Sequence, residues 1–62
     1  MKVKIKGFNG ELPIYLTAGK EYAVIRIESL TTVYIRDDYG FNILIKPDNC
    51  SYLTGGSWEI VE

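Results

Sequence analysis

The chain has 62 residues, of which 47% are apolar and 24% are charged, and its formal net charge is −1. This length suits one small domain, residues 1–62, and the balance excludes a disordered chain, a strongly basic nucleic-acid binder and an acidic mimic of DNA. No apolar run is long enough for a membrane-spanning helix or a signal-peptide core, so we expect no membrane partner.

The composition favours strands, because sixteen residues are Val, Ile or Thr and eight are aromatic. The first predicted strand is Lys2–Lys6, where two aliphatic residues alternate with three lysines. The two glycines of residues 7–10 then indicate a turn. Residues 12–16 alternate but contain Pro13, which predicts an extended, irregular segment or an edge strand.

A second turn over Thr17–Lys20 leads into the longest predicted strand, Glu21–Glu28. Strict alternation places Ala23, Ile25 and Ile27 together on one face of this strand. A helix over residues 17–30 is the competing interpretation. The β-branched residues and the glycine within this segment favour the strand.

After a turn over residues 29–32, Val33–Asp37 is predicted to run back as a strand. The sequence Asp37-Asp38-Tyr39-Gly40 indicates a tight hairpin, since Asp can bond its own backbone and Gly adopts a positive φ. In the return strand, alternation predicts an inner face made of Phe41, Ile43 and Ile45.

Residues 47–53 resemble a loop with one short 3₁₀ turn, and Trp58–Val61 is the last predicted strand after the break at Gly55-Gly56. Five strands in so short a chain predict an all-β fold, curled into a single small five-stranded barrel with one core. The residues expected in that core are Val3, Ile5, Leu16, Val24 or its neighbours, Ile35, Ile43, Ile45, Trp58 and Ile60.

The order of these elements resembles an SH3-like barrel. Residues 16–22, Leu-Thr-Ala-Gly-Lys-Glu-Tyr, are similar to its diverging turn, and residues 33–45 are similar to its distal hairpin. Together with residues 53–59, Leu-Thr-Gly-Gly-Ser-Trp-Glu, these motifs are also similar to tiny accessory proteins of bacteriophages and prophages. The resemblance covers almost the whole chain, and it implies a fold more specifically than an activity because the motifs are turn chemistry.

The chain departs from the SH3 domains that bind polyproline. Its first strand lacks their tyrosine-rich stretch, its first long loop holds only Glu11 as an acidic residue, and Trp58 lies in the final strand. Pro47 and Tyr52 match the usual peptide groove, but turn and core roles explain both. These departures disfavour polyproline recognition, which needs an aromatic-lined groove.

Candidate catalytic groups are few, and we expect neither an enzyme nor a bound metal or cofactor. Cys50 is the only strong nucleophile, and the chain has no histidine to activate it, so a buried structural role is favoured. A single cysteine also forms no internal disulfide, which indicates the reducing cytoplasm. The hairpin tip explains both Asp37 and Asp38 as turn residues. Gly55-Gly56 precedes no helix that could complete a phosphate loop.

The tyrosines are more numerous than one small core needs, and they suggest a binding surface. Tyr34 should lie on the face opposite Val33 and Ile35, with Leu44 outside the core across the hairpin. Tyrosine and arginine are enriched at interface hot spots because they combine a large contact area with a polar end. The predicted binding residues are Tyr15, Tyr34, Arg36, Tyr39 and Leu44.

Three functions are compatible with these residues. The favoured hypothesis is a non-enzymatic interaction module of phage type in the bacterial cytoplasm, which binds a host protein, such as a defence protein, or itself. The first alternative is an oligomer that sequesters a small nucleotide-like ligand at subunit interfaces through Arg26 and Arg36. The second is single-stranded nucleic-acid binding by Lys2, Lys4 and Lys6 with stacking tyrosines, which the net charge disfavours.

Overall fold

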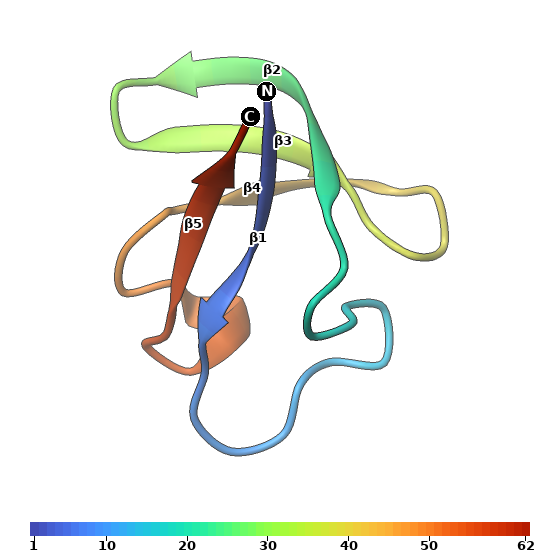
Figure 1. The fold of residues 1–62 in the computed structure, drawn as a ribbon, viewed down its shortest axis with the longest axis vertical. Coiled ribbons are helices and arrows are strands. Elements are labelled where there is room, and N and C mark those ends of the chain that lie inside the picture. Colours follow the sequence, from blue (N-terminus) through green and yellow to red (C-terminus); the bar gives the residue numbers. More distant parts are fainter.

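Five antiparallel strands form one sheet in the computed structural model, which describes all 62 residues (Figure 1). The elements are β1 (Lys2–Gly7), β2 (Tyr22–Ser29), β3 (Thr32–Arg36), β4 (Asn42–Ile45), the 3₁₀ helix η1 (Ser51–Leu53) and β5 (Ser57–Val61). The predicted all-β fold and the predicted 3₁₀ turn are confirmed. None of the helical structure is long and apolar enough to cross a bilayer.

The strand order β4-β3-β2-β1-β5 places the first strand of the chain inside the sheet and leaves β4 and β5 as its two edges. In Figure 1, β1 and β5 run side by side and cross the direction of β3 and β4. Strand β2 connects these two pairs of strands, because its first residues pair with β1 and its later residues pair with β3. No ladder joins β4 to β5, so the sheet is not closed, and the SH3-like barrel remains a prediction.

A bulge interrupts the alternation of β2, and the predicted grouping of Ala23, Ile25 and Ile27 on one face is therefore wrong. Val24 pairs with Ile35, whereas Arg26 pairs with the residue before Ile35, so Ile25 is an extra residue in the ladder. An extra residue shifts the side-chain alternation by one position. Ala23 and Ile25 are exposed on the outside, and Ile27 turns to the same side as Val24.

The buried core confirms most of the residues predicted from the sequence. Nine apolar side chains are buried: Val3, Ile5, Leu16, Tyr22, Ile35, Ile45, Cys50, Leu53 and Trp58. Val24 and Ile43 are partly buried and pack against this cluster. The prediction was wrong for Ile60 and Phe41, which are 60% and 68% exposed.

The two errors have different causes. Phe41 lies before β4, where its N–H donates to the side chain of Asp37, so it belongs to the turn rather than to the strand. In β5, Trp58 is covered by the preceding loop, and its N–H donates to the Pro47 carbonyl at 2.7 Å. Ile60 lies beyond that cover and therefore remains open to solvent.

The hairpin between β3 and β4 has the predicted turn and register. The N–H of Gly40 donates to the Asp37 carbonyl at 3.1 Å, and Gly40 has a φ of 85°, which favours glycine. Across the two strands Ile35 faces Ile43, both toward the core, and Tyr34 faces Leu44 on the opposite side. The register thus places an apolar pair on each side of the hairpin.

Candidate functional site

The side of β2, β3 and β4 that points away from the core forms the principal candidate site. We call it the outer face, and its residues are Ile25, Arg26, Tyr34, Arg36, Asn42 and Leu44. Their positions follow from the register, because their cross-strand neighbours Val24, Ile35 and Ile43 point inward. The extensive contacts of β2, β3 and β4 with other elements are all with their neighbours in the sheet, so no further element packs on the outer face.

A row of three side chains crosses the outer face. Arg26 pairs with Tyr34, and Tyr34 pairs with Leu44, so the tyrosine ring lies between a guanidinium and an aliphatic side chain. Tyr34 is partly buried, while Leu44 is 38% exposed and Ile25 is 44% exposed. The centre of the outer face is therefore apolar and open to solvent.

Both guanidinium groups of the chain lie on this face, with Arg26 across from Tyr34 on β2 and Arg36 two residues beyond Tyr34 in β3. Arg26 forms an exposed ion pair with Glu28 at 3.5 Å, and the Nε of Arg36 donates to the Asn42 Oδ1 at 3.5 Å. These contacts are long and exposed, so they hold the side chains weakly. The guanidinium donors therefore remain free to bind an anionic or carbonyl group.

The five predicted binding residues occupy three places in the structure. Tyr34, Arg36 and Leu44 meet on the outer face. Tyr39 stands at the hairpin tip and is 61% exposed. Tyr15 lies apart from the outer face, where its partly buried ring meets the edge of the Tyr52 ring at a centroid distance of 6.1 Å.

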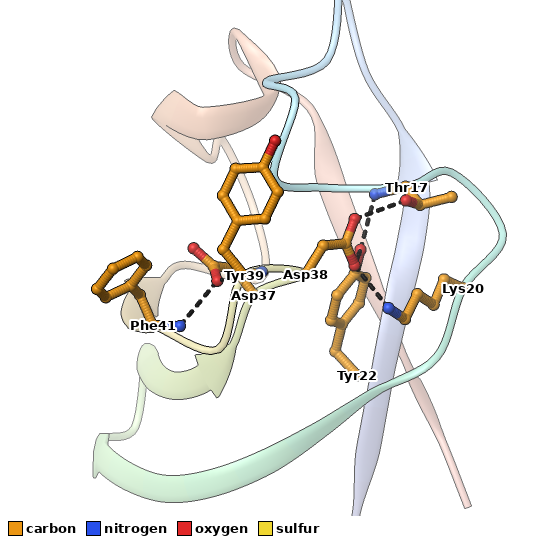
Figure 2. A network of polar contacts seen from close by, with 7 residues as sticks. All are labelled: Thr17, Lys20, Tyr22, Asp37, Asp38, Tyr39 and Phe41. Carbon is orange, nitrogen blue, oxygen red and sulfur yellow. Dashed lines mark hydrogen bonds and ion pairs between the residues drawn. The ribbon is translucent and has the colours of Figure 1, made fainter.

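A polar network joins the hairpin tip to the turn over residues 17–20 (Figure 2). The Asp38 carboxylate accepts hydrogen bonds from the Thr17 hydroxyl at 2.6 Å, the Lys20 ammonium at 2.6 Å and the Tyr22 hydroxyl at 2.9 Å. The Tyr22 oxygen in turn accepts the N–H of Thr17 at 2.7 Å. The expectation that the turn alone explains Asp38 is therefore wrong, because its side chain binds a distant segment.

Asp37 has the turn role expected of it. One of its carboxylate oxygens accepts the N–H groups of Tyr39 and Phe41, both at 2.9 Å (Figure 2). The side chain is nearly buried, at 9% exposed. A buried carboxylate needs such donors, since leaving it without them would cost free energy. Asp37 thus holds the hairpin tip that presents Tyr39.

The network shifts the protonation equilibria of its members. Chiefly through the hydrogen bond from Lys20, and then that from Thr17, the pKa of Asp38 lies below its usual value. The same hydrogen bond to Asp38 raises the pKa of Lys20. Burial is the main cause that raises the pKa of Tyr22. At neutral pH the network therefore holds an ionised carboxylate beside an ammonium and a neutral phenol, which suits a structural link.

A second exposed surface is an apolar groove, which the sequence analysis did not identify. Its volume is about 250 Å³, and it lies between β1, β2, β3 and β5 on the inner side of the sheet. We call it the end groove. It is lined by Met1, Val3, Val24, Ile27, Ser29, Leu30, Thr32, Val33, Pro47 and Ile60. The bulge in β2 and the exposed end of β5 together create the groove. The sequence pattern of the two strands predicts neither feature.

The remaining chemically distinctive side chains are enclosed. Cys50 is 1% exposed and belongs to the core, as its predicted structural role requires. The ring of Trp58 meets the edge of the Tyr22 ring at 5.9 Å, and its Nε1 is buried without a hydrogen-bond partner. No three His, Cys, Asp or Glu side chains lie close enough together to hold a metal ion. The exposed chemistry of the chain thus lies on the outer face, at the hairpin tip and in the end groove.

Comparison of the chain with protein-family models, with curated proteins and with solved structures finds no match. The exposed surfaces of the molecule therefore carry the inference about its function.

Proposed function

We propose that this protein is a non-enzymatic interaction module that binds a partner protein through the outer face. The supporting observation is the row formed by Arg26, Tyr34 and Leu44, which crosses three strands and is uncovered in the chain. Tyrosine and arginine supply much of the binding energy at interfaces, and an apolar centre with a polar rim is the usual arrangement.

The sheet gives this surface the rigidity that binding requires. Tyr34 is fixed by pairing on both sides, and Ile35 beside it in the strand is fully buried at 0% exposed. A side chain held in place before binding loses little conformational entropy in a complex. Tyr39, presented by the turn that Asp37 stabilises, adds a second exposed tyrosine beyond the end of β3.

The resemblance of the chain to accessory proteins of phages suggests the biological setting. We propose that it folds as an SH3-like barrel, is encoded by a phage or another mobile element, and works in the cytoplasm of a bacterial host. In that setting the partner is a host protein, and binding inhibits it, as expected of an anti-defence protein. The order of diverging turn, distal hairpin and 3₁₀ turn before β5 is the feature that supports the barrel.

A specific observation favours sequestration of a nucleotide-like anion as the second candidate function. Arg26 and Arg36 lie on the same face as Tyr34, Arg26 as its partner across the strands and Arg36 two residues along β3. Guanidinium groups bind phosphate through two parallel hydrogen bonds, and an aromatic ring can stack on a base. Nucleic-acid binding is less favoured, since a net charge of −1 gives the chain little attraction for a phosphate backbone.

The experiment that tests the proposed function is site-specific photo-crosslinking in a bacterial host, with the crosslinking amino acid at Leu44. We expect one discrete adduct with a host protein, and none with the same amino acid at Ile14, which is 81% exposed and is not an outer-face residue. The partner so identified is then titrated with the purified protein and its variants.

We expect Tyr34→Ala and Tyr39→Ala each to weaken that binding by about tenfold or more, the effect of removing a hot-spot side chain. Circular dichroism should show that both variants remain folded, because neither ring belongs to the core. Unchanged affinity in both variants would reject the outer face as the site. Retention of a nucleotide by the purified wild-type protein, with loss in Arg36→Ala, would instead establish the second candidate.

A further inference from the structure

The end groove exposes apolar surface that belongs to the interior of the sheet. Its floor is Val3, which is 3% exposed, and Val24 and Val33 form partly buried walls. The rim consists of side chains that are more than half exposed: Met1 at 57%, Ile27 at 61%, Ile60 at 60% and Leu30 at 104%. A cluster of this kind is unusual on a monomer and is typical of an interaction surface.

The size and chemistry of the end groove favour a protein side chain as its occupant. Small-molecule sites commonly enclose about 300–1,000 Å³ and combine apolar walls with a few placed polar groups. At about 250 Å³ the end groove is smaller, and seven of its ten lining residues are hydrophobic. One or two aliphatic side chains from another protein surface would fill it.

A suitable aliphatic side chain stands on the same surface. Leu30 occupies the tip of the turn between β2 and β3, with its side chain entirely in solvent. On its other side lies a second hollow of about 270 Å³, lined by Leu30, Thr31, Lys46, Pro47 and Asp48. Leu30 therefore forms a ridge between an apolar hollow and a charged one.

This surface carries one unpaired charge of each sign. Lys46 and Asp48 line the second hollow together, and neither forms an ion pair within the chain. In a two-fold interface each contact from one copy to the other occurs twice, so a surface needs both partners of every contact. This surface has two such pairs of partners. One is Leu30 with the end groove, and the other is Lys46 with Asp48.

We propose that the end groove is the interface of a symmetric homodimer. Leu30 of each copy inserts into the end groove of the other, and Lys46 of each copy pairs with Asp48 of the other. A standard interface covers about 800 Å² of each partner. That is about one fifth of the 4148 Å² surface of this chain, so the interface must extend from the two hollows onto the residues around them. The outer face points to the opposite side of β2 and β3 and stays free for a partner protein.

The first test is sedimentation analysis of the untagged protein from micromolar to millimolar concentration. We expect the 7.0 kDa chain to associate to twice that mass as the concentration rises. Leu30→Asp should remain monomeric over the whole range and stay folded, because Leu30 makes no buried contact in the single chain. Ile14→Asp, a matched change at a position 81% exposed and outside the groove, should dimerise as the wild type does.

The second test exchanges the charges. Lys46→Glu and Asp48→Lys should each weaken the dimer, because each variant places like charges opposite one another. An equimolar mixture of the two variants should recover wild-type association as a heterodimer, since every pair across the interface is then of opposite sign. A contact formed within one chain could not produce this recovery.

Several results would overturn the proposal. Wild-type protein that stays at 7.0 kDa up to millimolar concentration forms no such dimer. Dimerisation that survives Leu30→Asp, or no recovery in the mixture of charge variants, would place the interface elsewhere. An aliphatic compound retained by a monomer in native mass spectrometry would identify the end groove as a small-molecule site instead. Dimerisation unaffected by Tyr34→Ala keeps this test separate from that of the proposed function.

Discussion

Asp38 is the residue whose role extends furthest beyond its position in the chain. Its side chain joins the hairpin tip to Thr17, Lys20 and Tyr22, residues 16 to 21 positions earlier in the sequence. The backbone adds to this link, since the N–H of Asp38 donates to the Tyr15 carbonyl at 2.9 Å. A residue that the sequence predicts as part of a local turn thus fixes the position of the irregular segment before β2.

The lowered pKa of Asp38 predicts an acid-dependent loss of stability. A carboxyl group with a pKa below its unfolded value, about 3.9, stabilises the fold above that value, and the contribution disappears as the pH falls through the folded pKa. We therefore expect wild type to be more stable than Asp38→Asn at pH 7. The difference in unfolding free energy should shrink below about pH 4. Urea unfolding of both proteins between pH 7 and pH 2.5 measures it.

The raised pKa of Lys20 predicts a second loss of stability, at alkaline pH. Because its pKa is raised, its contribution is present below the ordinary value of 10.5 and is lost as the pH rises through the folded pKa. The advantage of wild type over Asp38→Asn should therefore also decline in alkaline solution. A difference that stays constant from pH 2.5 to pH 7 would show that the Asp38 carboxylate has no net stabilising interaction with the network.

Gly56 is a position where backbone meets backbone. A Cβ atom added there would overlap the carbonyl oxygen of Gly7 and lie 2.8 Å from the Cα of Phe8. We expect Gly56→Ala to destabilise the protein by about 3 kcal/mol or more, because the main chain of β1 cannot yield as a side chain can. Gly7→Ala is the matched control, since a Cβ there meets nothing within 4 Å. Chemical unfolding that gives similar losses for both variants would contradict the close approach.

At the scale of the elements, the short helix η1, which lies between β4 and β5 in the chain, contributes Leu53 to the core. Leu53, its last residue, is 1% exposed, and the turn ends with Thr54 in the left-handed conformation at a φ of 52°. We expect Leu53→Ala to cost about 2–5 kcal/mol, since a buried leucine leaves a cavity when truncated. Ile14→Ala, at a position 81% exposed, should change the unfolding free energy by less than about 0.5 kcal/mol.

If Leu53→Ala lowered the free energy of unfolding no more than Ile14→Ala does, the packing of η1 would not contribute to stability. Thermal unfolding followed by circular dichroism distinguishes the two outcomes.

The strands and their turns could be predicted from the sequence because alternation and turn chemistry are local. The hairpin of residues 37–40 and the pairing of Tyr34 with Leu44 followed from two residues of turn chemistry and the period of a strand. The bulge at Ile25 could not be predicted in this way. It inserts one residue with no change in composition, and it moves Ile27 from the predicted shared face to the end groove.

The candidate site was predicted in part for the same reason. Three of its residues share a strand pair and could be placed by counting, whereas Tyr15 could not, because its surroundings depend on how the irregular segment before Thr17 folds back. The burial of Tyr22 likewise depends on contacts with Trp58 and Asp38, which are distant in sequence. Long-range packing, rather than local pattern, decides which of the five tyrosines reach the surface.

At the scale of the whole molecule, the chain has more apolar surface than its core can use. Its 4148 Å² of accessible surface is close to the roughly 4,000 Å² expected of a compact 7.0 kDa monomer. Ten residues are buried, while ten large hydrophobic side chains are exposed. Most of these exposed side chains outside the turns form two clusters on opposite sides of β2 and β3, one on the outer face and one around the end groove. A protein with this surface is suited to contact two partners at once.

The pairing of β1 with β5 has a consequence for the order in which the chain folds. Lys2 pairs with Val61, so the loop that this contact closes contains nearly every residue of the protein. Strands β2, β3 and β4 are joined by short turns and can form early, but the sheet is complete only when the two ends of the chain meet. Because β1 lies between β2 and β5, loss of a few N-terminal residues would remove hydrogen bonds from inside the sheet, whereas loss of a few C-terminal residues would remove the edge strand that pairs with β1. The pairing of the two ends therefore completes the fold, and a chain that lacked either end would unfold more readily and be cleaved by proteases.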